Sequence, residues 1–379
     1  MIRRNVFKAI LFNAVLAFAL QAQFTVSTDF TAMYDDNINN SSYRVEDRIG
    51  QLSMIAGYEW GKENTATQIA YTGSLSYFTR VLDRTFHYHT LGLTQSRLLG
   101  QDAATDLSLG AAYSFRINRE YYTFYDHSQF SLFGNLKFNI TDEVTGKTGY
   151  TFRALAFSQL PDFNYTEHSG FAQISFSLPT KTSVIFEGNL GFKVYESANF
   201  DSANSGGVMM GAGRNRVAAS TPTVTQLIGI LRIGQSITEM TGLSLTATYL
   251  GNIQKESRYL SSSYGTISDD EIFDDHYAYE GPHGSIMLSH LVNENLILRI
   301  AGGIQAKLYS DRPAFDLAGT QIADQRKDTR RYLTLLAQLY VETLDVTVSG
   351  QYDYISNSSN DEYYRYANNA MTVTFSLPF

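Results

Sequence analysis

The chain has 379 residues, with 29 Lys and Arg against 37 Asp and Glu, and a formal net charge of -8 at pH 7. An acidic chain is a poor nucleic-acid binder because the nucleic-acid backbone is anionic, so no nucleic-acid partner is expected. The chain has no Cys, which excludes disulfides, thiol nucleophiles and thiolate metal sites.

The first 22 residues have the pattern of a secretory signal peptide. Two Arg and one Lys form a positive start, and an apolar run follows from Ala9 to Leu20. This run is shorter than the ~20 residues that a spanning helix needs. We expect cleavage after Ala22, with cleavage after Ala19 or an uncleaved anchor as the alternatives. Residues 1–22 are then the signal peptide, and residues 23–379 form one domain with 26 basic against 37 acidic residues, a formal charge of -11.

Alternation of apolar and polar residues recurs along the rest of the chain. It is clearest in Phe130–Ile140, Val184–Val194 and Leu344–Tyr354, where one face is apolar and the other is polar or charged. No segment after the signal peptide has 18 consecutive apolar residues, which excludes a helical membrane protein. The mean hydropathy of -0.19 fits a membrane barrel, because each strand shows lipid only every second residue. The 26 Tyr and 24 Phe and the scarcity of Pro, with 6 residues, favour the same structure.

Sixteen such segments follow one another. They span approximately residues 24–36, 46–60, 65–79, 87–99, 104–117, 127–140, 146–159, 167–178, 182–196, 223–236, 242–255, 278–291, 295–309, 329–342, 344–356 and 365–379. The connections alternate between short and longer, and three of the longer ones are extended: 197–222, 257–277 and 310–327. Short turns mark the periplasmic side of a bacterial barrel, and an even strand number places both termini there. Merging or splitting one hairpin leaves fourteen or eighteen strands open.

The fold class that follows is all-β, a transmembrane antiparallel up-and-down β-barrel. The segment Met371–Phe379 alternates strictly and ends on an aromatic residue. It resembles the C-terminal signal by which the assembly machinery of the Gram-negative outer membrane recognises barrel proteins. The resemblance implies the barrel assembly machinery as a partner during biogenesis, and outer-membrane lipid and lipopolysaccharide as the surroundings.

Charged side chains fall on the faces opposite the apolar rows. The basic ones are Arg116, Lys137, Arg153, Lys193, Arg232, Arg299 and Lys307, and the acidic ones are Glu59, Glu187, Glu342, Asp345 and Asp353. Because unpaired charges are too costly in a dry core, these residues predict a water-filled lumen that they line. The basic residues lie on strands five to thirteen and the acids mostly on the fourteenth and fifteenth, which predicts a transverse field favouring anionic solutes on one wall. The alternative is a set of solvated charges and salt bridges with no role in solute binding.

General porins narrow the pore with a long third external loop. Here the third loop, Arg119–Asp126, is short and rich in Tyr. The fifth loop is the better candidate, because Ser205–Gly213 is small and flexible and Arg214 and Arg216 follow directly. We predict that this loop folds into the lumen and presents both arginines at a constriction. A surface loop without this role is the alternative.

Catalytic and metal sites are not predicted. Histidines lie beside acidic and Ser residues near external strand ends, in Glu167–Ser169 and Asp126–Ser128, and His276 follows two Asp in the sixth loop. Neighbouring residues on a strand point to opposite faces, so they make poor catalytic partners. The acidic segments Asp35–Asn37 and Asp269–Asp275 are candidate Ca²⁺ ligands, but they lack EF-hand spacing. We therefore expect no enzyme, no cofactor and no bound metal.

The segment Tyr34–Asn37, Tyr-Asp-Asp-Asn, closes the first strand. It resembles uncharacterised outer-membrane β-barrel porins, some of them encoded beside polysaccharide-export genes. The resemblance covers four residues and the general architecture, implies a passive conduit, and carries over no catalytic residue. We expect an outer-membrane channel for diffusion or export of small hydrophilic or saccharide solutes. The alternatives are a non-transport surface adhesin or envelope scaffold and a hydrolase at the barrel rim. The oligomeric state stays open, although trimers are common among sixteen-stranded porins.

Overall fold

The computed structural model describes the protein over residues 23–100, 105–196, 223–255, 276–309 and 312–378. The expected signal peptide, the expected constriction loop with Arg214 and Arg216, and the terminal Phe379 lie outside these ranges. Sixteen of the strands formed by the described residues close into one antiparallel barrel. Over the same ranges, no helix has the length and apolar character needed to cross a membrane.

The barrel strands are 13 to 16 residues long. They are β1 (Gln23–Asp35), β2 (Asp47–Lys62), β3 (Thr65–Phe78), β4 (Phe86–Leu99), β5 (Thr105–Asn118), β6 (His127–Asn139), β7 (Val144–Phe157), β8 (Tyr165–Leu178), β9 (Thr182–Tyr195), β10 (Thr223–Ser236), β11 (Thr241–Lys255), β12 (Gly281–Asn293), β13 (Leu296–Tyr309), β16 (Arg326–Val341), β17 (Val346–Ser359) and β18 (Tyr366–Pro378). Five short 3-10 helices lie in the described connections: η1 (Leu82–Arg84), η2 (Glu120–Tyr125), η3 (Pro161–Phe163), η4 (His276–Ala278) and η5 (Glu342–Leu344).

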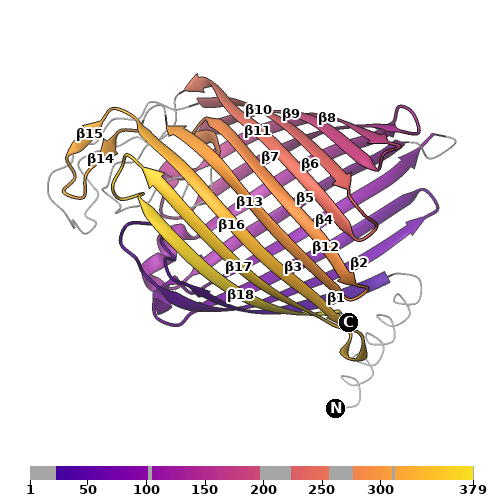
Figure 1. The fold of residues 1–379 in the computed structure, drawn as a ribbon, viewed down its shortest axis with the longest axis horizontal. Coiled ribbons are helices and arrows are strands. Elements are labelled where there is room, and N and C mark those ends of the chain that lie inside the picture. The colour runs from indigo at the N-terminus through magenta and orange to yellow at the C-terminus, as the bar shows by residue number, and fades with distance from the viewer. Residues whose placement is uncertain (1–22, 101–104, 197–222, 256–275, 310–311, 379) are drawn as a thin grey trace, which may run out of the picture.

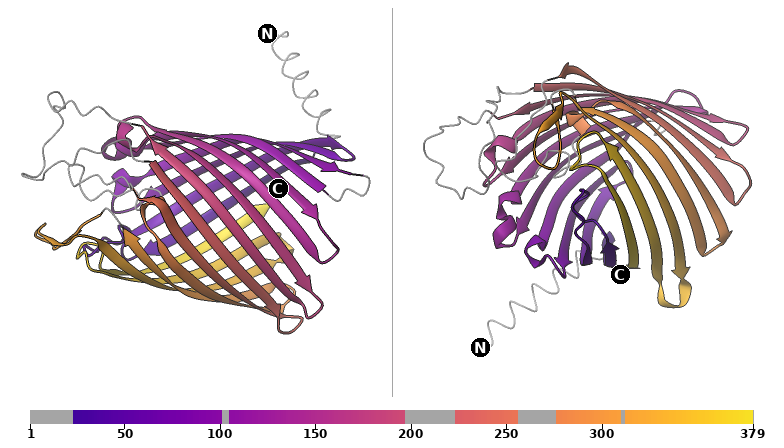
Figure 2. Two further views of the ribbon diagram at one scale, coloured as in Figure 1. Left: turned by 90° about the horizontal axis from the view of Figure 1, so that it is seen from above. Right: turned by 60° about the vertical axis from the view of Figure 1, so that its left-hand side comes forward.

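The strands follow an up-and-down order, and β1 pairs with β18 to close the ring. The short strands β14 (Ala314–Phe315) and β15 (Gln321–Ala323) form a separate hairpin, so β13 pairs directly with β16. The start of β1 and the end of β18 lie at the end of the barrel opposite the β14–β15 hairpin (Figure 1). The strands cross the wall at a steep tilt (Figure 2), which a closed barrel requires. We call the end with the β14–β15 hairpin extracellular and the end with the two termini periplasmic.

Alternation along each strand separates an apolar outer face from a polar inner face. In β17, Val348 and Tyr352 lie outside, opposite Leu339 and Leu335 of β16. Leu335 is 39% exposed, and large apolar side chains exposed to this degree recur around the barrel. Such a surface is stable when it faces lipid rather than water. The predicted alternation of apolar and polar residues therefore agrees with the outer and inner faces of the strands.

The sixteen predicted strands correspond to the sixteen barrel strands, which confirms the expected fold class. The β14–β15 hairpin was not predicted, and it lies inside the expected external loop 310–327. Several strand boundaries differ by two or three residues. Ala278 belongs to η4 and β12 begins only at Gly281, and Leu344 belongs to η5 and β17 begins only at Val346. Between Leu344 and Val346, Asp345 adopts a left-handed conformation with φ 51°, which ends the tight turn, and its Oδ1 accepts a hydrogen bond of 2.8 Å from the Tyr340 hydroxyl.

The Tyr34–Asn37 segment lies at the seam where β1 meets β18. The Asp36 carboxylate accepts a bond of 2.8 Å from the Asn369 backbone N–H and one of 2.7 Å from the Asn369 side-chain amide. Asn37 is fully buried, and its amide donates to the Ser41 carbonyl oxygen at 2.8 Å and to the Ala367 carbonyl oxygen of β18 at 3.3 Å. These residues therefore fasten the first strand to the last one.

This seam gives a first prediction. Replacement Asp36→Ala removes two bonds to Asn369, one of them to a side chain, and we expect it to lower the free energy of unfolding by about 1–3 kcal/mol. The measurement is urea denaturation of the folded barrel in detergent. The control is Asp142→Ala, in the exposed turn between β6 and β7, for which we expect no change. Equal stability of the two variants would contradict a role of Asp36 in closure.

Candidate functional site

The inner face of the barrel carries nine of the residues that the sequence predicts to line a pore. Each alternates with exposed apolar residues of the outer face: Arg116 on β5, Lys137 on β6, Arg153 on β7, Glu187 and Lys193 on β9, Arg232 on β10, Arg299 and Lys307 on β13, and Asp353 on β17. Glu59 on β2 shares this face, whereas Glu342 and Asp345 belong to the periplasmic turn and not to a strand. The inner face is therefore the candidate site.

The extracellular end of the lumen holds two buried apolar clusters. The first consists of Leu155, Phe157, Leu160, Phe163, Tyr165, Tyr195, Val224 and Tyr277. The second consists of Leu250, Ala278, Tyr279 and Tyr309. The segment His276–Glu280, which contains η4 and leads into β12, supplies residues to both clusters. Here we call it the mouth segment. It packs against the inner wall, so this part of the lumen is narrowed by protein.

Glu167 anchors the mouth segment from β8. Its side chain accepts a bond of 3.1 Å from Arg153 Nη1 and one of 3.2 Å from the Tyr277 hydroxyl. Glu167 is only 6% exposed, and its direct neighbour across the strand pair is Lys193. A buried carboxylate with these partners satisfies its charge locally. The interaction ties Tyr277 to the barrel wall.

Two lysines of the mouth are covered by aromatic rings. Lys193 Nζ lies 3.8 Å from the ring centroid of Tyr165 and 4.6 Å from that of Tyr195. Lys307 Nζ lies 4.3 Å from the ring centroid of Tyr279. Both lysines are buried, and ring faces attract cations most strongly where water is excluded. These two charges therefore take part in packing at the mouth.

Gln226 of β10 fixes the backbone of the mouth segment. Its side-chain amide donates to the carbonyl oxygens of His276 at 2.8 Å and Tyr279 at 3.1 Å. Its Oε1 lies 2.6 Å from His276 Nδ1. Gln226 is 1% exposed, so these bonds are formed away from water. The mouth segment is thus held by backbone and side-chain contacts together.

Two carboxylates in the extracellular connections have shifted pKa values. Burial raises the pKa of Asp361, whose Oδ2 accepts a bond of 3.0 Å from the backbone N–H of Phe315 in β14. This bond fastens the β14–β15 hairpin to the connection between β17 and β18.

The hydroxyl of Tyr34 donates to Glu46 at 2.8 Å and lowers the pKa of that carboxyl, and an ion pair between Glu46 and Arg80 lowers it further.

Nearer the periplasmic end, the charges are more exposed. Arg232 Nη1 lies 3.6 Å from Glu187 Oε2, and the Arg232 side chain is 43% exposed. Asp353 on β17 accepts a bond of 2.6 Å from the hydroxyl of Thr334 on β16. Arg153 and Arg232 therefore both have carboxylate partners within the lumen.

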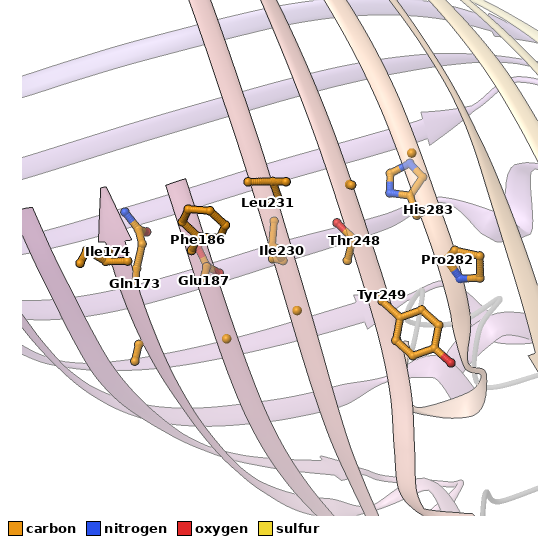
Figure 3. Close-up of a pocket in the computed structure, with 15 residues that line it drawn as sticks. Gln173, Ile174, Phe186, Glu187, Ile230, Leu231, Thr248, Tyr249, Pro282 and His283 are labelled. Atoms are coloured by element: carbon orange, nitrogen blue, oxygen red, sulfur yellow. The ribbon is translucent and has the colours of Figure 1, made fainter. Parts of the chain in front are cut away.

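The barrel wall is hollowed over β8 to β12, in a space of about 980 Å³. Figure 3 shows the side chains around it, including Phe186, Leu231 and Tyr249. Small residues on adjacent strands, Gly188 paired with Gly229 among them, leave this part of the wall shallow. The lining residues come from the barrel strands β8 to β12 and include no residue of the mouth segment, so the hollow is a feature of the wall.

Two of the rim histidines, His127 and His168, lie beside a carbonyl oxygen and a hydroxyl group. His127 Nδ1 lies 2.9 Å from the Tyr125 carbonyl oxygen. His168 faces outward and its Nδ1 lies 2.6 Å from the Tyr150 hydroxyl. Neither contact pairs a serine with a base. Within the described ranges, no group of three His, Asp or Glu residues is close enough to hold a metal ion, while Asp269–Asp275 lies outside them.

Three residues of the lumen escaped the sequence analysis. The sequence pattern indicates Glu167 only as a rim acid, although its alternation with outward His168 places it inside. Lys147 is not among the predicted lumen residues, although the register places it opposite Lys137. No local sequence pattern indicates Tyr277 as a lumen residue, because only the tertiary structure brings it to β8.

Solved structures show the same fold at low sequence identity. OccK8 (OprE) of Pseudomonas aeruginosa has a TM-score of 0.53 and 10% identity, over 96% of this chain and 99% of that one. OccAB1 of Acinetobacter baumannii has a TM-score of 0.52 and 9% identity, over 96% and 97%. The outer membrane protein OpdK of P. aeruginosa has a TM-score of 0.51 and 9% identity, over 94% and 99%. No protein-family model and no curated protein sequence matches the chain. The fold is that of bacterial outer-membrane barrels, in agreement with the expected location.

The docking of the mouth segment can be tested with a single thiol, since the chain has no Cys. In an Ala278→Cys variant the thiol is buried, so a water-soluble maleimide should label it slowly. A Cβ placed on Gly191 would overlap the Tyr277 ring. Adding Gly191→Ala should therefore speed labelling at least about tenfold, which corresponds to about 1.4 kcal/mol of lost docking free energy.

The control for this experiment is Gly188→Ala on the same strand, where an added Cβ meets nothing within 4 Å. We expect it to leave the labelling rate unchanged. Equal rates in the Gly191 and Gly188 variants would show that Tyr277 is not docked as described.

Proposed function

We propose that the barrel is an outer-membrane channel for passive diffusion or export of small hydrophilic solutes, saccharides included. The observation that carries the proposal is the exposure of inward side chains. Ile55 on β2 faces the lumen between outward Met54 and Ala56, yet it is 44% exposed. An apolar side chain inside a packed barrel would be buried. Its exposure, together with that of Arg232, supports a wide interior filled with water.

The narrow part of this channel, in our proposal, is the mouth segment with Glu167, Lys193 and Tyr277. It occupies the side of the lumen formed by β7 to β13. Carboxylate, ammonium, amide and phenol groups along the path can exchange hydrogen bonds with a hydrophilic solute. An adhesin or scaffold would instead be supported by a lumen packed shut along its whole length.

The remaining partners belong to the same proposal. The exposed apolar outer face fits outer-membrane lipid and lipopolysaccharide. The alternating end of β18, whose outward row contains Met371, Val373 and Phe375, supports the barrel assembly machinery as the partner during biogenesis. A rim hydrolase finds no support in the two His contacts described above.

Ion conductance tests the channel directly. Purified protein in a planar lipid bilayer should give stepwise currents. Arg232→Glu and Arg299→Glu each replace a positive by a negative charge on the inner face, so each should shift the ion selectivity toward cations. Reversal potentials in a salt gradient measure the shift.

The matched control is Lys327→Glu, which makes the same charge change at an exposed outer position at the extracellular end of β16. We expect a smaller shift from it than from either lumen variant. Absence of current at any voltage would contradict the channel and favour the scaffold.

A further inference from the structure

Lys137 on β6 and Lys147 on β7 are direct partners across the strand pair. Lys137 alternates with Leu136 and Phe138 of the outer face, so it points to the lumen, and its cross-strand partner shares that face. Side chains directly opposite one another have Cβ atoms about 5 Å apart. Both lysines are exposed and lie close to the periplasmic turn that joins β6 to β7. Two positive charges therefore stand side by side at the periplasmic end of the lumen.

The two ammonium groups differ from four other cations of the inner face described above. Arg153 and Arg232 have carboxylate partners, and Lys193 and Lys307 are covered by aromatic rings. Across the described residues, by contrast, neither Lys137 nor Lys147 has a carboxylate oxygen within 4.0 Å.

Asp106 of β5 is the cross-strand neighbour of Lys137 on its other side, but it forms no ion pair with it. Like charges directly opposite one another destabilise a sheet. Asp106 faces Lys137 on the same side of the sheet and offsets one of the two positive charges, so part of the repulsion between Lys137 and Lys147 remains. An anion placed between the two ammonium groups would relieve it.

The surroundings of the pair are polar, with one aromatic ring. Gln173 of β8 is the partner of Lys147 on the other side, and its amide donates to Ser175 at 2.8 Å. In the next inward row, Asn135 and the ring of Phe171 lie over Gly149, where an added Cβ would overlap both. Two ammonium donors beside amides and a ring edge are suited to the anionic group of an organic solute.

We propose that Lys137 and Lys147 together bind an oxyanion, the carboxylate or phosphate group of a solute, at the periplasmic end of the lumen. This inference rests on the proposed function, because it assigns the site to a solute that travels through the barrel. The two charges favour a divalent phosphate over a monovalent carboxylate. The site makes the periplasmic end of the channel selective for anionic solutes.

The test compares wild type with the double variant Lys137→Gln, Lys147→Gln. Binding of inorganic phosphate and of acetate to the folded barrel in detergent is measured by isothermal titration calorimetry. We expect wild type to bind phosphate more tightly than acetate, and the double variant to bind phosphate at least about tenfold more weakly. The control, Lys62→Gln with Lys181→Gln, removes two exposed lysines from the same end but outside the lumen, and it should bind as wild type does.

Equal phosphate binding by wild type and the double variant would overturn the proposal, and so would an equal loss in the control. Equal affinities of wild type for phosphate and acetate would overturn the preference for a divalent anion. Binding in detergent does not depend on conductance. A barrel that conducts without binding anions refutes this inference alone, whereas a barrel that binds phosphate without conducting refutes the channel.

A structural role of the lysines makes a different prediction. If the pair binds an anion, the variant Lys147→Gln removes repulsion and, without added anion, is at least as stable to urea as wild type. Added phosphate then stabilises wild type more than the variant. A loss of stability in Lys147→Gln without anion, unaccompanied by any effect on phosphate binding, would assign the lysines to folding and overturn the proposal.

Discussion

Pairing of β1 with β18 is the constraint on which the other features of this barrel depend. A sheet edge that faces lipid leaves backbone N–H and C=O groups without partners, and the ring removes that edge. At the extracellular end of the seam, Asp36 bonds to Asn369 through both backbone and side chain. Once the ring is closed, every strand has one face toward lipid and one toward the lumen, so the alternation of residues follows from the same constraint.

The lumen divides into two regions that satisfy charge differently. At the extracellular mouth, Glu167, Lys193 and Tyr277 are buried among aromatic residues, and the charges are balanced by ion pairs and ring faces. Toward the periplasmic end, Lys137 and Lys147 are exposed and lie opposite one another. Charged groups in the low dielectric of the mouth need partners on the protein, whereas charged groups in contact with water at the other end do not. In the proposed anion site, a solute would replace water there without first breaking protein contacts.

The strands could be predicted because a closed barrel imposes period two on nearly every segment, and Phe130–Ile140 and Val184–Val194 show it without ambiguity. Asp345 was misplaced because its apolar neighbour Leu344 continues the alternation into a turn whose left-handed residue the pattern does not reveal. The inward position of Arg153 follows from alternation, but its partner Glu167 depends on the register between β7 and β8. The contacts of Tyr277 join segments more than one hundred residues apart, and no local pattern records them.

The central claim is that a water-filled lumen runs behind an apolar outer face, and single cysteines in this Cys-free chain test it most directly. On β2, Ser53 and Ile55 face inward, whereas Leu52 and Met54 face outward. Each is replaced by Cys in turn, and the barrel in lipid vesicles is exposed to a charged, membrane-impermeant thiol reagent. The account predicts fast labelling at positions 53 and 55 and slow labelling at 52 and 54. Equal labelling at all four positions, or none at the inward pair, would contradict it.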